Sequence, residues 1–215
     1  MSVKLYNITD KQNMKKDIYQ KKIEKIIDRY SAGYAFSSAD FIDISNIDAI
    51  NKALSRLCES GVIRRIIHGI YDKPIYSRSL SSYSSPDINS VALALARKYN
   101  WTIAPAEETA LNILHISTQV SNKWCYISDG PYRKYKIGKF TLEFKHCANK
   151  EISGKSNKTI TIIQALKYIG KDHIQSKDLK IISSGLTAKE KRILLEESKT
   201  TTIWIYNLVK EINNL

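Results

Sequence analysis

The sequence predicts an α+β protein with an N-terminal helical module that ends in a basic β-hairpin, followed by a mixed α/β domain. Two observations predict this class. Helical patterns precede a β-branched segment in the first third of the chain, whereas helix and strand patterns alternate from residue 87 onward. A length of 215 residues with 43% hydrophobic residues allows two cores. The Ser/Tyr/Pro run at residues 77–86 (SRSLSSYSSP) is the expected linker between domains at residues 1–76 and 87–215.

Two helices are expected first in the N-terminal domain. Hydrophobic residues recur at helical spacing within residues 11–29, which predicts an amphipathic helix. Ser37, followed three residues later by Asp40, has the pattern of a capping box. This pair predicts a short second helix over residues 37–43 that buries Phe41.

A third helix and a hairpin complete the domain. Asn46 can cap the third helix, and Gly61 ends it where a left-handed residue is favoured. The β-branched residues 62–67 and the short segment 70–71 then predict a hairpin with two arginines. The third helix is expected to bury Ile47, Ile50, Leu54 and Leu57 and to leave its polar residues on the opposite face.

This order of elements is that of a winged helix-turn-helix domain, in which the third helix enters the major groove and the wing contacts the DNA backbone. Asn51 can bond adenine edges and Arg56 can bond guanine, whereas the wing arginines suit phosphates. Asp48 on the same helix face opposes phosphate binding, and winged helices also serve protein contacts. The expected DNA-binding residues are Ser45, Asn46, Asn51, Lys52, Ser55, Arg56, Arg64, Arg65 and His68.

The net charge favours a polyanionic partner. Lys and Arg number 34 against 21 Asp and Glu, which gives a formal charge of +13, and nucleic acid is the first candidate for such an excess. No apolar run approaches the roughly 20 residues that cross a bilayer, and the N-terminus lacks a secretory signal. Three widely spaced cysteines favour a reducing compartment, so the expected location is the cytoplasm.

The C-terminal domain is expected to contain a hairpin among several helices. Strands are predicted at residues 124–128 and in a hairpin over residues 135–145. The other segments predicted are helices over residues 87–99, 106–115, 160–169, 188–199 and 203–212, and a short strand at 101–103. A second basic surface is expected from Lys123, Arg133, Lys134, Lys136, Lys139 and Lys145.

Acidic residues in this domain offer an alternative function. Glu107, Asp129, Glu143 and Lys145 resemble the acid, acid and acid-x-Lys pattern of restriction-type nucleases, whose carboxylates hold Mg²⁺. Acid-x-Lys also occurs often on any solvated strand, so a charged surface is the favoured interpretation. Nucleotide-binding loops, zinc motifs and serine-hydrolase motifs are absent from the sequence. We therefore expect a protein that is not an enzyme, with no metal and no cofactor.

Several stretches resemble a known protein family. Residues 33–41, 53–57 and 61–72 look like the winged helix of AbiEi-type antitoxins and regulators. Residues 114–120, the segment Tyr126-Ile-Ser-Asp-Gly-Pro131 and Ile137-Gly138 resemble a DUF6088-type branch of these proteins, and the resemblance covers about residues 30–170.

The resemblance implies a transcriptional autoregulator and antitoxin of a type IV toxin–antitoxin system. Its winged helix would bind inverted repeats in double-stranded DNA of its own promoter, and its C-terminal domain would supply antitoxin activity. The implied partner is a nucleotidyltransferase-like toxin that is countered without a stable complex. Some winged helices of this type are fused to nuclease domains, which keeps the nuclease alternative open beside a third one, an RNA-binding or protein-binding module.

Overall fold

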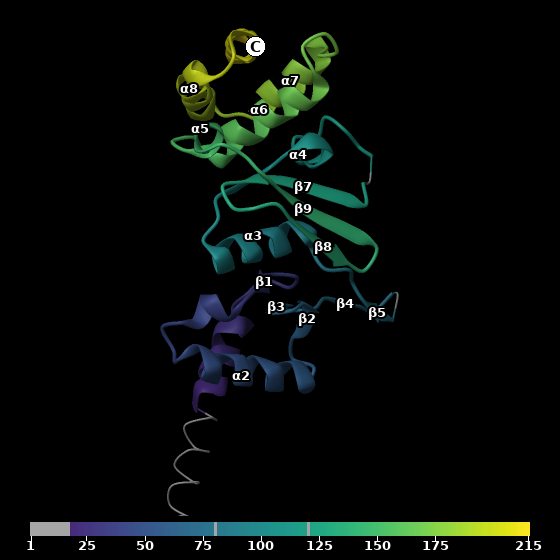
Figure 1. Cartoon of the computed structure of the whole chain (residues 1–215). Helices are drawn as coiled ribbons and strands as arrows, with labels where there is room; N and C mark the ends of the chain where they lie inside the picture. The colour runs from purple at the N-terminus through teal and green to yellow at the C-terminus, as the bar shows by residue number, and fades with distance from the viewer. Residues whose placement is uncertain (1–17, 80, 120) are drawn as a thin grey trace, which may run out of the picture. The chain divides into compact units, whose positions relative to one another are not determined.

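The structure is a computed structural model that describes residues 18–79, 81–119 and 121–215. The chain forms two compact units, Met1–Asn100 and Trp101–Leu215, called here the N-terminal and C-terminal units. Each unit contains helices and strands, in agreement with the expected α+β class (Figure 1). No helix in the described part of the chain is long and apolar enough to cross a membrane.

The N-terminal unit begins with a helix whose described part spans residues 18–28, and residues 11–17 of the predicted helix lie outside the described residues. A short hairpin at residues 76–83 follows the hairpin at residues 64–72 and overlaps the segment expected to be a linker. The elements in order are β1 (Ala35–Phe36), the 3₁₀ helix η1 (Ser38–Phe41), α2 (Ile47–Glu59), β2 (Arg64–Ile67), β3 (Ile70–Asp72), β4 (Tyr76–Ser77), β5 (Ser82–Tyr83) and α3 (Ile88–Tyr99).

Both predicted helix caps, at Ser37 and at Asn46, form in the structure. The Ser37 hydroxyl accepts a hydrogen bond from the Ala39 amide, while the Asp40 carboxylate accepts one from the Ser37 amide at 2.8 Å. The Asn46 side chain accepts a bond from the Ala49 amide at 2.9 Å and caps α2. These bonds satisfy helix donors that otherwise lack partners.

The buried face of α2 packs on the first helix and η1. Its core residues are Ile50, Ala53, Leu54 and Leu57, and they meet Ile23, Ile27, Phe36 and Phe41 in one cluster. The expectation that Ile47 is buried is wrong, because this first residue of the helix is 48% exposed. It lies at the edge of the apolar stripe, where the chain turns away from the core.

A three-stranded antiparallel sheet joins β1, which precedes α2, to the hairpin strands β2 and β3 in the order β1-β3-β2. Arg64 and Asp72 are directly opposite each other on β2 and β3. The guanidinium of Arg64 donates to both carboxylate oxygens of Asp72, at 3.1 and 2.6 Å. The side chain of Asp72 is only 1% exposed, so its carboxylate is desolvated. The bidentate pair with Arg64 neutralises this buried charge.

Helix α3 belongs to the N-terminal unit, although the sequence places it in the C-terminal domain. Arg97 of α3 bonds the Asp40 carboxylate at 2.7 Å and the Ala35 carbonyl at 2.8 Å. The Ser90 hydroxyl accepts from the Ala35 amide at 2.7 Å. The boundary between the units therefore follows Asn100 and does not lie at residues 77–86. The composition of residues 77–86 suggested a linker, but composition cannot show the long-range bonds that hold α3 in the N-terminal unit.

The C-terminal unit contains a four-stranded sheet in the order β6-β7-β9-β8. Strands β7 and β9 are parallel, and the other two pairs are antiparallel. Helices α4 and α6 lie over one face of this sheet (Figure 1). The elements are β6 (Ile103–Pro105), α4 (Glu107–Ile113), β7 (Lys123–Ser128), β8 (Arg133–Ile137), β9 (Phe140–His146), α5 (Asn149–Ile152) and α6 (Asn157–Ile169).

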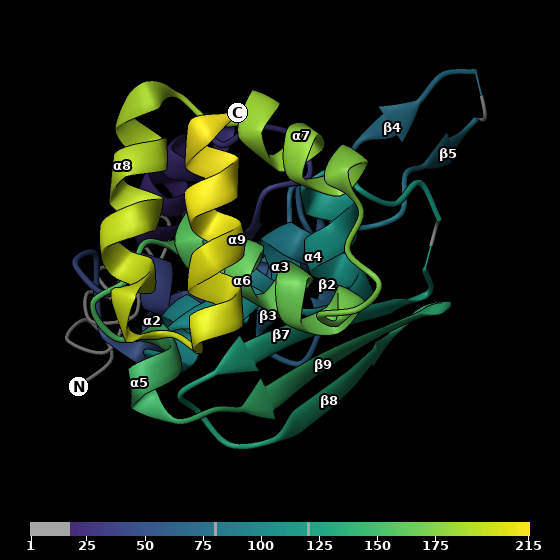
Figure 2. The same cartoon turned by 90° about the horizontal axis from the view of Figure 1, so that it is seen from above.

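The last third of this unit is helical and has its own core. Figure 2 shows α8 (Ala188–Glu197) and α9 (Ile203–Asn214) side by side, with α7 (Ser176–Ser184) beside α9. Ile162, Leu166, Leu194 and Val209 belong to one buried cluster. The helices predicted at residues 160–169, 188–199 and 203–212 are thereby confirmed to within a few residues, whereas α5 and α7 were not predicted.

Removal of the carboxylate charge at residue 72 tests how far the N-terminal unit depends on its buried ion pair. We expect Asp72→Asn to lower the free energy of unfolding of this unit by about 3 kcal/mol, at the low end of the range for broken buried pairs, because Arg64 keeps partial access to water. Amide hydrogen exchange of β3 measures the change. Asp43→Asn, at an exposed position, is the control and should leave exchange unaltered. If the β3 amides are equally protected from exchange in Asp72→Asn and Asp43→Asn, the Arg64–Asp72 pair is dispensable for the stability of this unit.

Candidate nucleic-acid interface

The polar face of α2 presents the side chains expected to read DNA. Asn51 and Lys52 are exposed, and Ser55 and Arg56 one turn later are half-buried. Residues three and four apart lie on the same side of a helix, so these four form a single surface opposite Ile50 and its neighbours. Among the described residues, neither Lys52 nor Arg56 forms an ion pair. Their charges therefore remain available to an external anion.

The two residues before α2 differ in what they can offer. Asn46 is exposed, but its side-chain oxygen is used by the cap of α2, which leaves its amide nitrogen for a further bond. Ser45 is half-buried in the preceding turn. Both lie at the N-terminal end of the helix, where backbone amides and the helix dipole favour negative charge.

Arg65 of β2 joins the hairpin to the helix face. Its guanidinium donates to the Ser55 hydroxyl at 3.4 Å and to the Tyr71 hydroxyl at 3.0 Å. The same group lies over the Tyr71 ring, 5.3 Å from the centroid. Because Arg65 is exposed and held by these contacts, a cation is fixed beside the polar face of α2.

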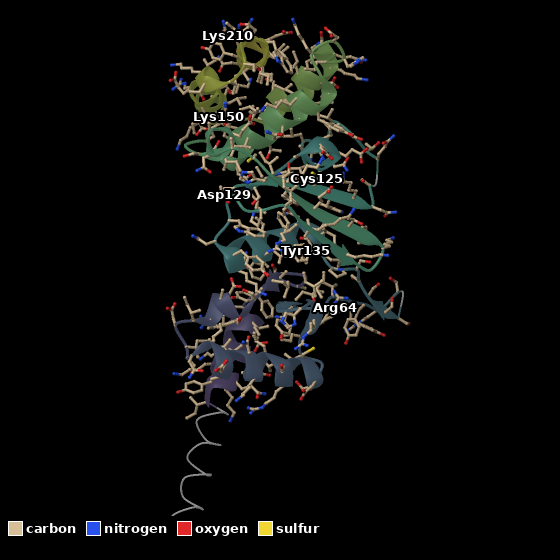
Figure 3. The ribbon with its side chains drawn as sticks, viewed as in Figure 1. Arg64, Cys125, Asp129, Tyr135, Lys150 and Lys210 are labelled. Atoms are coloured by element: carbon tan, nitrogen blue, oxygen red, sulfur yellow. The ribbon has the colours of Figure 1, made fainter. Side chains whose placement is uncertain are left out.

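Arg64 has a different environment from its neighbour. Besides the two bonds to Asp72, it donates to the Ser84 carbonyl at 2.8 Å. Figure 3 shows Arg64 near the base of the β4–β5 hairpin. Three of its donors are thus used inside the unit, and we assign this residue to holding the fold instead of contacting a phosphate.

The turn between β2 and β3 lies next to Lys98, a cation that the sequence did not predict for this site. His68 is exposed in this turn, and its carbonyl accepts a bond from the Lys98 ammonium at 3.5 Å. Lys98 lies on α3, 30 residues further along the chain. No local pattern could associate it with the hairpin, because the association depends on the packing of α3.

The second basic surface separates into two groups. Side chains alternate between the faces of a strand, and the register places Lys123, Lys134, Lys136 and Lys145 on one face of the sheet. Arg133 alternates to the opposite face, and Lys139 lies in the turn between β8 and β9. Four of the six predicted residues therefore share a surface.

Two of these lysines form a charge network with two glutamates. Lys145 pairs with Glu107, and Lys123 lies 3.4 Å from Glu107 and 3.0 Å from Glu143. The hydrogen bond with Glu143 raises the pKa of Lys123, and the bond with Glu107 raises the pKa of Lys145. Burial raises the pKa of Glu107, but the bond from Lys145 and the charge of Lys123 outweigh it and leave the pKa below its ordinary value.

Glu107 adopts an unusual backbone conformation. Its φ of 53° is in the left-handed region, where residues other than glycine are strained. The residue opens α4, and from there its carboxylate reaches both lysines of the sheet. The strain and the ion pairs together indicate that this charged cluster has a fixed geometry.

Three of the four predicted nuclease residues, Glu107, Glu143 and Lys145, belong to the charge network, and Asp129 lies outside it. Glu143 is opposite Cys125 on β7, whereas Asp129 follows the end of β7, four residues or roughly 13 Å further along. Figure 3 shows Cys125 and Asp129 well apart on this unit. The Asp129 carboxylate accepts a bond from the Thr102 amide at 2.9 Å. Within the described residues, no group of three His, Cys, Asp or Glu side chains is arranged to hold a metal ion.

The thiol beside the charged cluster is protected by its surroundings. Cys125 is 2% exposed, and burial raises its pKa to about 12, with a further contribution from the charge of Glu107. Since the thiolate is the nucleophilic form, this cysteine is unreactive near neutral pH.

The lowered pKa of Glu107 predicts an acid-sensitive stability in the C-terminal unit. A depressed folded-state pKa adds stability above the ordinary carboxyl pKa, and this stability is lost as the pH falls through the lowered value. We expect Glu107→Gln to be less stable than wild type at pH 7, with a difference that shrinks steadily below about pH 4.5.

Urea unfolding followed by tryptophan fluorescence can measure this, because Trp101, Trp124 and Trp204 all lie in the C-terminal unit. Glu108→Gln alters the next residue, which takes no part in the lysine network, and is the matched control. A difference that persists unchanged at pH 3 would contradict the electrostatic explanation.

Comparison with known proteins assigns the chain to a family. The family described as a family of unknown function (DUF6088) matches residues 22–194. No curated protein matches the sequence. The matched region contains α2, the β2–β3 hairpin and the whole four-stranded sheet, so it spans both the helix face and the charged cluster. Since this match extends over most of the sequence, the chain belongs to the DUF6088 family.

Proposed function

We propose that the protein is a DNA-binding transcriptional regulator whose N-terminal unit is a winged helix. The observation that carries the proposal is the contact between Arg65 and Ser55, which holds a hairpin cation beside the polar face of α2. Support for the winged helix comes from the element order and from the strand order β1-β3-β2, in which the strand before η1 pairs with the second strand of the hairpin.

In this proposal α2 lies in the major groove and the hairpin follows the adjacent backbone. Asn51 and Arg56 have the donor and acceptor groups that distinguish adenine and guanine edges. Lys52, Arg65, His68 and Lys98 bind phosphates and carry no sequence information themselves. Asp48, on the same helix face, repels phosphates and opposes DNA binding.

The C-terminal unit supplies the second part of the proposal, an antitoxin activity of the type IV class. Its support is the sheet face with Lys123, Lys134, Lys136 and Lys145, which offers an anionic partner a surface separate from the DNA-binding helix. The proposed functional partner is a nucleotidyltransferase-like toxin, which is countered without a stable complex. This basic surface supports binding better than metal-dependent cleavage, because Lys123 and Lys145 neutralise Glu107 and Glu143, and Asp129 lies apart from them.

Substitutions on α2 and on β2 should have different effects on DNA binding. We expect Arg56→Ala to lower the discrimination between the gene's own upstream duplex and a scrambled duplex by about 1–3 kcal/mol. Arg65→Ala should weaken binding to both duplexes equally and reduce the slope of log K against log salt by about one. Fluorescence anisotropy at several salt concentrations measures both effects. Lys25→Ala, on the exposed side of the first helix, is the charge-matched control.

Two results would contradict the DNA-binding proposal. One is equal affinity of the wild type for both duplexes, which would indicate that its charge attracts any polyanion. The other is unchanged binding by both arginine variants, which would show that α2 and the hairpin do not contact the duplex.

Regulation and toxin neutralisation should be separable by mutation. We expect Arg56→Ala to release promoter repression while it still protects cells that express the adjacent toxin, because the altered residue lies outside the C-terminal unit. The combined variant Lys134→Ala and Lys136→Ala should retain repression and lose protection. A promoter reporter and a growth assay measure the two activities in the same strain. Loss of both activities in either variant would argue against separate surfaces.

A further inference from the structure

The β4–β5 hairpin presents two aromatic rings to solvent. Tyr76 and Tyr83 are directly opposite each other across the two strands, and their rings meet edge to face with centroids 5.3 Å apart. They are 54% and 58% exposed. Exposed tyrosines of this kind pair an apolar ring with a free hydroxyl, and they are enriched where proteins bind partners.

The base of this hairpin is fixed to the three-stranded sheet. Strands of two residues are too short to be stable as an isolated hairpin. Here the Ser84 amide donates to the Ile75 carbonyl at 2.8 Å and closes the base. Arg64 bonds the Ser84 carbonyl on one side and the buried Asp72 on the other. The buried ion pair therefore holds the hairpin in a defined position next to the β2–β3 hairpin.

The chemistry of the hairpin matches a phosphate backbone. Residues 75–85 (IYSRSLSSYSS) contain one arginine, two tyrosines, six serines and no Asp or Glu. Hydroxyl and guanidinium groups donate hydrogen bonds to phosphate oxygens, and the lack of carboxylates removes repulsion. Arg78 is exposed close to the end of the hairpin.

We propose that the β4–β5 hairpin is a second contact with the sugar–phosphate backbone of duplex DNA, made by Arg78 and the hydroxyls of Tyr76 and Tyr83. This inference rests on the proposed function and adds to it a contact that is independent of base sequence. In this proposal, the segment that was expected to be a linker takes part in DNA binding. The proposed contact lies on a hairpin that Arg64 connects to the buried Asp72.

The test measures binding of the full-length protein to the upstream duplex and to a scrambled duplex. We expect Arg78→Ala to weaken binding to both duplexes about 3- to 10-fold and to reduce the salt slope by about one. The double variant Tyr76→Phe and Tyr83→Phe keeps the rings and should also weaken both duplexes equally. Tyr132→Phe, at a 69% exposed tyrosine in the C-terminal unit, and Arg29→Ala, at an exposed arginine after the first helix, are the matched controls.

Hydroxyl-radical footprinting adds a positional readout. Arg78→Ala should lose protection at one backbone segment and keep the protection due to α2. If Arg78→Ala and the tyrosine variant bind as wild type does while Arg65→Ala is weakened, the inference is wrong and the proposed function stands. If wild type binds neither duplex, the proposed function fails and the inference fails with it. If the hairpin variants bind DNA normally but lose a protein partner in a pull-down, the hairpin is a protein-binding element and the inference is overturned.

Discussion

The ion pair between Arg64 and Asp72 is the constraint on which the arrangement of the N-terminal unit depends. It joins β2 to β3, and the third bond of Arg64 reaches the β4–β5 hairpin. A buried carboxylate is costly without a partner, so this geometry is strongly favoured over any other register of the two strands. With Arg64 directed inward, the alternation of the strand directs Arg65 outward toward Ser55 and the polar face of α2. The buried pair thus sets the direction of Arg65, and the core packing of α2 sets the position of its polar face.

The same division between structural and available charges applies to the C-terminal unit. Lys123 and Lys145 are held by Glu107 and Glu143, and Glu107, whose backbone is left-handed, pairs with both lysines. Lys134 and Lys136 on β8 are exposed on the same face of the sheet. On this surface, Lys123 and Lys145 are therefore neutralised by glutamates, whereas Lys134 and Lys136 remain available to a partner. An anionic partner would meet the available lysines first.

Local sequence signals predicted the elements of the N-terminal unit because each has a short-range cause. The capping box of Ser37 and Asp40, the Asn46 cap and the apolar spacing of Ile50, Leu54 and Leu57 act within a few residues. The domain boundary, the role of Arg64 and the place of Lys98 could not be predicted in this way, because each depends on residues that are distant in sequence. For the candidate site, periodicity predicted the exposed polar face of α2, and the two hairpin arginines were predicted from their residue type. Of the nuclease pattern, Glu107, Glu143 and Lys145 meet in one charge network, whereas Asp129 does not, because it follows the end of β7.

We propose that α2 and the β2–β3 hairpin are the surface that binds DNA. The most direct test is to titrate the upstream duplex into ¹⁵N-labelled protein at about 150 mM salt, where nonspecific phosphate binding is weak, and to map the amide shifts. We expect saturable shifts concentrated at Asn51, Lys52, Ser55, Arg56 and Arg65, with a smaller response to a scrambled duplex. Shifts confined to the lysines of the C-terminal sheet, or absent from α2, would contradict this proposal.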